Sequence, residues 1–349
     1  MNPFTYTRAA SVADAIAAGG QPGAAFLGGG TNLLDLMKGG IEQPRVIVDV
    51  TRLPGLDRIE RQPDDGSTRV GALVRNSDLA WDDGFRRAYP AVAEALRAGA
   101  SAQLRNAATT AGNLLQRTRC PYFYDTASRC NKRQPGSGCD AFGGFNRLHA
   151  VLGWSDQCIA TNPSDFCVPL AALDATVEIE GPHGSRSVPL TEFHRLPGDH
   201  PERDTVLEPG ELIVAVTMPP EAAAFAGNAR YLKVRDRNSY AFAVVSAAAA
   251  LQMEGGRIKA ARLAFGGVAL KPWRSKDAEA LLAGAEPSRE AFERAAAKAV
   301  EGARGQGEND FKPELARRVA VRAFLLAARG TPAELPALPA SPFAGDLHA

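Results

Sequence analysis

Five cysteines lie within one short stretch of this 349-residue sequence, and thiolates are side chains that bind metals and metal clusters. They are Cys120, Cys130, Cys139, Cys158 and Cys167. Disulfides are the least favoured use of these thiols, because the chain is long enough to bury an ordinary core, shows no signal peptide and has an odd number of cysteines. A metal or metal-cluster site is the better interpretation.

Zinc and an iron–sulfur cluster both take four thiolates. Structural zinc usually draws on close Cys-x-x-Cys pairs, and no such pair is present here. A cluster is larger and can be held by ligands spread along a wrapping loop. The run Pro121–Tyr124 beside Cys120 offers an apolar shell, and the glycines of 135–138 free backbone amides to approach sulfur. The spacing alone leaves both kinds of site open.

A glycine-rich segment near the N-terminus is the first candidate binding loop. Its residues are Phe26, Leu27, Gly28, Gly29, Gly30, Thr31, Asn32, Leu33 and Leu34. Consecutive glycines after a strand let the backbone approach a ligand closely, and the bare amides suit a pyrophosphate. A Rossmann fingerprint would need glycine at position 33, and the Gly-Lys-Ser/Thr ending of a P-loop is missing. Taken alone, three glycines could also form a plain turn.

A second segment of small and hydroxyl-bearing residues follows Arg105. It contains Thr109, Thr110, Gly112 and Asn113. We expect a loop here. Two such loops can clamp the two ends of a pyrophosphate.

The pattern of apolar residues divides the chain into successive units. Ser11 opens a short helix, and strands at 24–27 and 45–50 complete a small α/β unit over residues 1–55. A second unit, residues 56–225, has helical periodicity interrupted near Pro90 and strands at 70–74, 176–179 and 211–218.

The remaining sequence predicts a separate C-terminal domain over residues 226–330, after a proline-marked boundary. Antiparallel strands are expected at 231–234, 241–253 and 258–268, with helices at 292–303 and 313–328 packed on them. The Pro-rich residues 331–349 are typical of a peripheral or disordered tail, or of a segment that lies along a partner.

Composition excludes two classes of partner. The formal net charge of +1 gives no electrostatic footprint for nucleic acid. No apolar run approaches the roughly 20 residues that span a bilayer, so no membrane span is expected.

Several motifs together resemble a known family. They are the loop 28–32, the run 104–114, Pro163-Ser164-Asp165, and 231–237. Their order is similar to that in FAD-binding subunits of the xanthine dehydrogenase family of molybdenum hydroxylases, over about residues 4–328. Segments 116–122 and 130–139 resemble the cluster-bearing insertion found in the bacterial periplasmic aldehyde oxidoreductase type.

The resemblance implies an α+β fold. It consists of a two-part PCMH-type FAD-binding domain, with a small N-terminal α/β unit and a larger α+β unit, followed by a C-terminal domain of antiparallel sheet and helices. A [4Fe–4S] insertion would occupy about residues 118–160. The implied complex is a heterotrimer with a molybdenum-cofactor large subunit and a small subunit carrying two [2Fe–2S] clusters. This chain would pass electrons through FAD to an external acceptor.

The resemblance also implies residue roles. Cys120, Cys130, Cys139 and Cys158 would bind the cluster, and Cys167 would be a spare, buried thiol. Residues 26–34 with Thr109, Thr110, Gly112 and Asn113 would bind the pyrophosphate. Asp165 would accept from a ribose hydroxyl or an adenine-side donor, or else cap a turn. Lys233 would lie at the pyrimidine edge of the flavin, or else be a solvated strand lysine, and Tyr240 would approach the flavin.

Some alternatives stay open. His149 lies among the cysteines, but four thiols suffice for a cluster, and a lone loop histidine is usually solvated. The same module serves 4-hydroxybenzoyl-CoA reductases and NAD-linked xanthine dehydrogenases, and a zinc-stapled scaffold without flavin is a remote third possibility. We expect periplasmic localisation by co-export with a signal-bearing partner, with the cytoplasm as the alternative.

Overall fold

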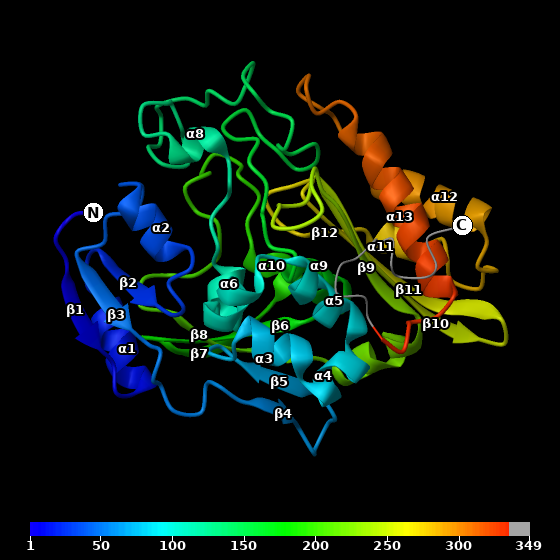
Figure 1. The fold of residues 1–349 in the computed structure, drawn as a ribbon, viewed down its shortest axis with the longest axis horizontal. Helices are drawn as coiled ribbons and strands as arrows, with labels where there is room; N and C mark the ends of the chain where they lie inside the picture. The colour runs from blue at the N-terminus through cyan, green and yellow to red at the C-terminus, as the bar shows by residue number, and fades with distance from the viewer. Residues whose placement is uncertain (335–349) are drawn as a thin grey trace.

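The computed structural model describes residues 1–334, which form three β-sheets with helices packed on them (Figure 1). Most of the predicted Pro-rich tail, residues 335–349, lies outside the described residues. Its first residue, Thr331, is hydrogen bonded to the backbone of Ala226, Gly227 and Ala229. No helix in residues 1–334 is long and apolar enough to cross a membrane.

The N-terminal unit is a three-stranded parallel sheet in the order β1-β3-β2. The strands are β1 (Thr5–Arg8), β2 (Ala24–Leu27) and β3 (Val46–Asp49), with helices α1 (Val12–Gly19) and α2 (Leu33–Lys38). The prediction that Ser11 opens a helix is confirmed, because its hydroxyl accepts from the Asp14 backbone N–H at 3.1 Å. The strand predicted at 24–27 is confirmed as β2, whereas β1 was not predicted from the sequence.

The middle sheet is antiparallel, in the order β4-β5-β8-β6-β7. Its strands are β4 (Ile59–Arg61), β5 (Thr68–Gly71), β6 (Thr176–Gly181), β7 (Gly184–Pro189) and β8 (Leu212–Met218). The accompanying helices are α3 (Asn76–Trp81), α4 (Asp83–Ala88), α5 (Pro90–Ala98), α6 (Ala102–Ala107), α7 (Thr110–Leu114), α9 (Cys167–Ala172) and α10 (Leu190–Phe193).

The interruption predicted near Pro90 is confirmed, and the helical stretch is divided once more, into the three short helices α3, α4 and α5. It breaks at Asp82, whose carboxylate accepts from the Phe85 backbone N–H at 2.7 Å and begins α4. It breaks again at Tyr89, because Pro90 has no N–H to continue a helix and fits only its first turn.

The C-terminal domain is a four-stranded antiparallel sheet in the order β12-β11-β10-β9. Its elements are η1 (Pro220–Asn228), β9 (Ala229–Val234), β10 (Val245–Glu254), β11 (Arg257–Gly266), β12 (Trp273–Arg274), α11 (Lys276–Ala280), α12 (Arg289–Ala299) and α13 (Lys312–Ala328). Apolar residues of the strands and of α11 to α13 form one core. The strand predicted from residue 241 begins at Val245, because residues 235–244 form the connection between β9 and β10.

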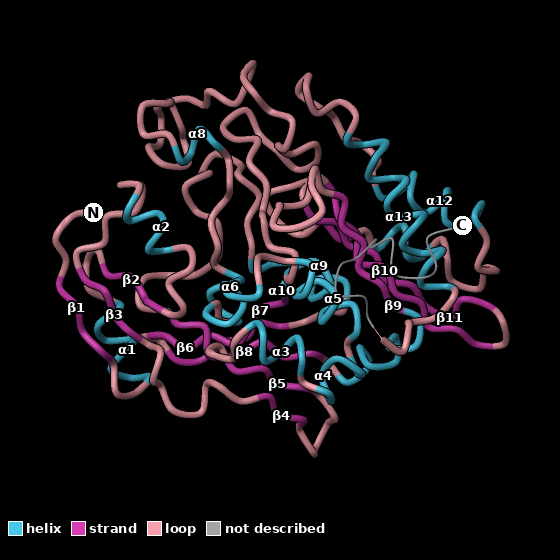
Figure 2. The backbone as a smooth tube through the Cα atoms, viewed as in Figure 1, coloured by secondary structure: helices cyan, strands magenta, loops and turns pink. Residues whose placement is uncertain are grey.

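The segment of about residues 118–160, which contains four of the five cysteines, is a long excursion with almost no regular structure (Figure 2). Its one helix, α8 (Pro121–Tyr124), lies near α2 at the top of the view in Figure 1. Leu36 of α2 packs with Phe123 and Cys130, and Lys312 at the start of α13 bonds the His149 carbonyl. The segment is therefore held by the N-terminal unit on one side and the C-terminal domain on the other.

Candidate functional site

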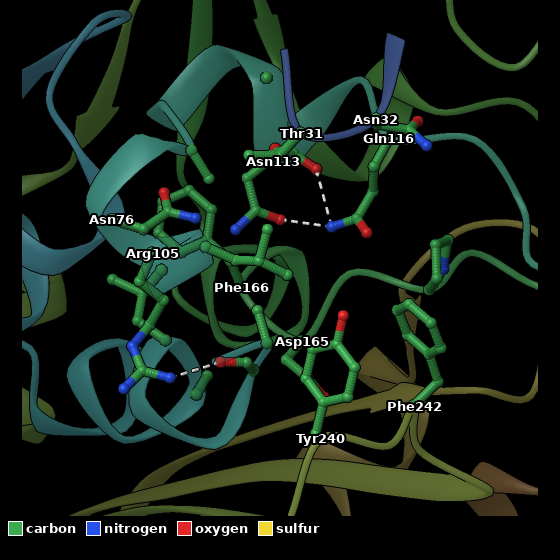
Figure 3. A pocket seen from close by; sticks show the side chains of 18 of the residues that line it. Thr31, Asn32, Asn76, Arg105, Asn113, Gln116, Asp165, Phe166, Tyr240 and Phe242 are labelled. Atoms are coloured by element: carbon green, nitrogen blue, oxygen red, sulfur yellow. Dashed lines mark hydrogen bonds between the residues drawn. The ribbon is translucent and has the colours of Figure 1, made fainter. Parts of the chain in front are cut away.

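A cavity of about 370 Å³ lies where the three parts of the chain meet (Figure 3). The N-terminal loop contributes Thr31 and Asn32, and the connection between β9 and β10 contributes Tyr240 and Phe242. Its other polar or aromatic lining residues are Asp35, Asn76, Arg105, Asn113, Gln116, Arg119, Asp165, Phe166 and Lys233. The cavity is large enough for part of an extended ligand and offers hydrogen-bonding side chains from several sides.

The glycine-rich segment 26–34 supplies two residues to this cavity. Thr31 and Asn32 line it, whereas Phe26, Leu27, the three glycines, Leu33 and Leu34 do not. Gly29 serves a contact within the protein, because a Cβ there would lie 2.0 Å from the Ala107 carbonyl oxygen. Gly30 has a φ of 72°, which favours glycine. The glycines thus let the loop pack against the connection between α6 and α7.

The prediction of a loop at 109–113 is wrong, because these residues begin helix α7. The Thr109 hydroxyl accepts from the Gly112 backbone N–H at 3.2 Å, and a buried Thr110 hydroxyl donates to the Val74 carbonyl at 3.0 Å. Gly112 and Asn113 line the cavity, whereas Thr109 and Thr110 do not. Asn113 Oδ1 accepts from Gln116 Nε2 at 2.6 Å, a contact drawn as a dashed line in the upper part of Figure 3.

Asp165 and Lys233 form a buried ion pair in the cavity wall. Lys233 Nζ donates to Asp165 Oδ2 at 2.7 Å and to the Ala98 carbonyl at 3.1 Å. The Tyr231 hydroxyl donates to Asp165 Oδ1 at 2.5 Å, and burial raises the pKa of Tyr231 well above its ordinary value. The alternative of a solvated Lys233 is wrong, because its side chain is 1% exposed. An ammonium has three N–H donors, so one is left for a ligand.

Two aromatic side chains form one edge of the cavity. Tyr240 and Phe242 are 55% and 43% exposed, and their rings lie near each other in Figure 3. Tyr240 has a φ of 51°, which is uncommon for a residue with a side chain. The Arg237 guanidinium donates to the carbonyl oxygens of Ser239 and Tyr240, so it stabilises the turn that carries Tyr240.

Three buried polar atoms around the cavity have no partner within the described part of the protein. They are Asn32 Nδ2, Asn76 Oδ1 and Arg119 Nε. Buried polar groups are nearly always hydrogen bonded, so a polar ligand would satisfy them. Asn76, Gln116, Arg119 and Phe242 were not predicted as site residues. Their only sequence signal is the position of Gln116 and Arg119 just before Cys120.

Four of the five cysteines line a second, small cavity. Cys120, Cys130, Cys139 and Cys158 surround it together with aromatic residues of α8. Burial raises the pKa of Cys120 to about 12 and that of Cys158 to about 11. Such thiols stay protonated unless a positively charged group binds them. Within residues 1–334 no three His, Cys, Asp or Glu side chains are grouped to hold a single metal ion.

Cys167 is separate from this group. It lies in α9, is completely buried and belongs to the apolar core of the middle unit. Its interpretation as a buried apolar residue is therefore confirmed.

The expectation of a solvated His149 is wrong. The ring is buried and lines the cysteine cavity, with Nε2 3.1 Å from Cys120 Sγ. Burial lowers the pKa of His149 to about 4, and the nearby Lys312 ammonium acts in the same direction. The packing of the start of α13 against residues 146–150 is what buries this loop histidine.

A third cavity, of about 130 Å³, lies between the other two. It shares Arg119, Pro163, Asp165 and Phe242 with the large cavity, and Thr118, Cys120 and His149 with the cysteine cavity. The three cavities therefore lie in a row. Of the four cysteines that line the cysteine cavity, Cys120 is the one that also lines the middle cavity.

Comparison with known proteins matches nearly the whole described chain. Residues 2–221 match the family described as FAD binding domain in molybdopterin dehydrogenase, and residues 230–327 match the CO dehydrogenase flavoprotein C-terminal domain. The aldehyde oxidoreductase FAD-binding subunit PaoB of Escherichia coli K12 is 53% identical over 321 residues, covering 91% of this chain and 96% of that protein.

More distant relatives agree with this match. A xanthine dehydrogenase FAD-binding subunit of Escherichia coli O157:H7 is 29% identical over 276 residues, covering 79% of this chain and 77% of the other. The structure is similar to a solved carbon monoxide dehydrogenase of Hydrogenophaga pseudoflava, with a TM-score of 0.73 and 26% identity over 95% of this chain and 99% of that one.

Proposed function

Because the chain belongs to the family of FAD-binding subunits of molybdopterin dehydrogenases, we propose that it is the FAD- and [4Fe–4S]-carrying electron-transfer subunit of a molybdenum-dependent aldehyde oxidoreductase. A large subunit with the molybdenum cofactor oxidises the aldehyde, and a small subunit with two [2Fe–2S] clusters delivers the electrons. This chain transfers them to an external acceptor.

The observation that carries this proposal is the row of three cavities, in which a polar cleft leads to four converging thiols. When bound, FAD supplies a group that takes up and releases electrons. In the cleft, Asn32, Asn76 and Arg119 have buried polar atoms that no group of residues 1–334 bonds and that would bond FAD. Tyr240 and Phe242 offer aromatic surface. Lys233 lines the cleft and keeps one N–H for a ligand, and its predicted place at the pyrimidine edge stays a prediction.

The residues of the second cavity suit a cluster. Cys120, Cys130, Cys139 and Cys158 would hold [4Fe–4S]. The positive charge of iron would offset the cost of ionising Cys120 and Cys158, whose pKa values burial raises. Phe123 and the aliphatic part of Lys132 exclude water around them. Lys132 Nζ is itself paired with Asp204, so its charge does not remain unpaired beside the sulfurs.

The aldehyde as substrate rests on the 53% identity to a subunit named for that activity. Substrate oxidation takes place on a partner chain in this proposal, so the residues of this chain do not select the aldehyde. Periplasmic localisation stays a prediction.

The test is anaerobic purification of the chain with its partner subunits. We expect one flavin, and four irons with four acid-labile sulfides on this chain, in addition to the clusters of the small subunit. A properly folded complex without flavin absorption would contradict the proposal, and stoichiometric zinc in a chain without acid-labile sulfide would favour the zinc-stapled scaffold.

A stopped-flow experiment tests the acceptor. We propose that the reduced complex is reoxidised faster by dioxygen or an artificial acceptor than by NAD, because the aldehyde oxidoreductase relative is the more similar one. Faster reoxidation by NAD would contradict this choice and favour the xanthine dehydrogenase type.

A further inference from the structure

We propose that His149 is a positioning residue for the iron–sulfur cluster and acts through Cys120. Its imidazole Nε2 donates a hydrogen bond to the Cys120 sulfur and thereby raises the reduction potential of the cluster. This inference rests on the proposed function, because it requires a cluster bound to the four thiols.

The contact itself is short and enclosed. His149 Nε2 lies 3.1 Å from Cys120 Sγ, and both side chains line the cysteine cavity. A thiolate bound to iron has no proton to donate, so the proton of this contact must be on Nε2. The other ring nitrogen, Nδ1, is buried and has no partner within residues 1–334.

The ring is held in place by distant parts of the chain. The His149 carbonyl accepts from Lys312 Nζ at 2.7 Å and from Asn309 Nδ2 at 3.1 Å, both near the start of α13. Its backbone N–H donates to the Asn146 carbonyl at 2.9 Å, and the next residue, Ala150, donates to Ile159 at 2.8 Å. Side chains some 160 positions away therefore fix the backbone that presents the imidazole to sulfur.

Cys120 is the thiol whose environment matters for the flavin. Of the four thiols lining the cysteine cavity, Cys120 also lines the intermediate cavity, which shares Asp165 and Phe242 with the large one. A hydrogen bond to its sulfur would therefore act at the cysteine that also borders the cavity next to the large cleft.

The direction of the effect follows from charge. Reduction adds an electron to the cluster and spreads negative charge onto the cysteine sulfurs. An N–H donor to sulfur stabilises that added charge, so it raises the potential. Removing the donor should make the cluster harder to reduce.

The experiment is a redox titration of the cluster, followed by electron paramagnetic resonance in the purified whole complex. His149→Leu removes the donor, and His149→Gln keeps an N–H donor. His183→Gln, at an exposed turn between β6 and β7, is the matched control. We expect a shift to lower potential in His149→Leu, a potential closer to the parent in His149→Gln, and no shift in the control. An unchanged potential in a His149→Leu complex with full iron and sulfide would overturn the inference.

A second measurement needs no variant that removes the imidazole. Pulsed electron paramagnetic resonance on the parent complex with ¹⁵N-labelled histidine should show one weakly coupled histidine nitrogen at the reduced [4Fe–4S] cluster. Absence of that coupling, or the strong coupling of a direct iron–nitrogen bond, would overturn the inference. If the parent chain holds no iron or sulfide, the proposed function fails instead.

Discussion

Lys233 Nζ lies 2.7 Å from Asp165 Oδ2, and this buried pair joins strand β9 to the segment that leads into α9. The pair forms part of the wall of the large cavity, and the Tyr231 hydroxyl bonds the second carboxylate oxygen. The cation predicted to act on the flavin is thus a structural partner of the carboxylate predicted to bind the adenosine side, and two groups this close cannot contact opposite ends of an extended FAD. Because the two groups share one hydrogen-bonded unit, neither can be changed independently.

Replacing Lys233 by Met should lower the free energy of unfolding by about 3–5 kcal/mol, because it leaves the Asp165 carboxylate buried without its cation. Adding Asp165→Asn to that variant should restore part of the loss. Urea denaturation of the complex measures both effects, and flavin content is read in parallel. Lys259→Met, at an exposed pair with Glu254, is the control and should change stability by less than about 1 kcal/mol. Equal effects at the two lysines would contradict this account.

Gly29→Ala should displace the N-terminal loop and reduce bound flavin, because its new Cβ would lie 2.0 Å from the Ala107 carbonyl oxygen. We expect a stability cost of about 1–3 kcal/mol, as for other overpacked sites. Gly20→Ala is the matched control, since a Cβ there meets nothing closer than 3.5 Å and the residue has an ordinary helical φ of −75°. Normal flavin content in Gly29→Ala would show that the close packing of the loop is dispensable.

Single Cys→Ser changes at Cys120, Cys130, Cys139 or Cys158 should remove most iron and acid-labile sulfide from this chain, because each takes one ligand from the same cavity. Cys167→Ala should keep both, at a stability cost of about 1 kcal/mol for the small gap it leaves in α9. Metal and sulfide analysis of the purified complexes provides the measurement. Loss of the cluster only in Cys167→Ala would reverse the assignment.

Acid should weaken the N-terminal sheet through Asp49. Burial acts to raise the pKa of this carboxyl, but hydrogen bonds from Thr51, Tyr6 and Arg8 outweigh it and hold the pKa below its ordinary value. The unfolded chain therefore binds the proton more tightly, so the stabilisation is present above about pH 4, the ordinary value for Asp, and is lost as pH falls towards the folded pKa.

Asp49→Asn should consequently be less stable than the parent at neutral pH, and the difference should shrink in acid. Denaturation curves of both proteins across the acidic range provide the measurement. A difference that stays constant with pH would show that the carboxylate charge does not contribute.

The structure supports the predicted cluster ligands more directly than it supports the residues predicted to bind the pyrophosphate. The four cysteines could be separated from Cys167, and the structure places them around one cavity while Cys167 lies in the core. The assignment of FAD contacts to residues 26–34 and to Thr109 and Thr110 stays a prediction, because only Thr31 and Asn32 of the first loop line the cleft.

The features that the sequence alone determined depend on interactions between residues close together in the chain. The hydroxyl of Ser11 caps the helix that follows it, and a short apolar run bounded by glycines gives β2 at 24–27. These features depend on neighbours a few positions away, so a pattern reveals them. The family motifs likewise identified an FAD-binding subunit before any tertiary contact was known.

Tertiary packing decided the pairing of β1, the burial of His149 and which residues meet at the cleft. Strand β1 has mostly exposed residues and no apolar alternation, so only its pairing with β3 defines it. His149 is buried because Asn309 and Lys312 hold its backbone, and Asn76 and Phe242 meet at one cleft from different domains. Contacts between residues more than a hundred positions apart depend on how whole elements pack, and no local periodicity encodes that information.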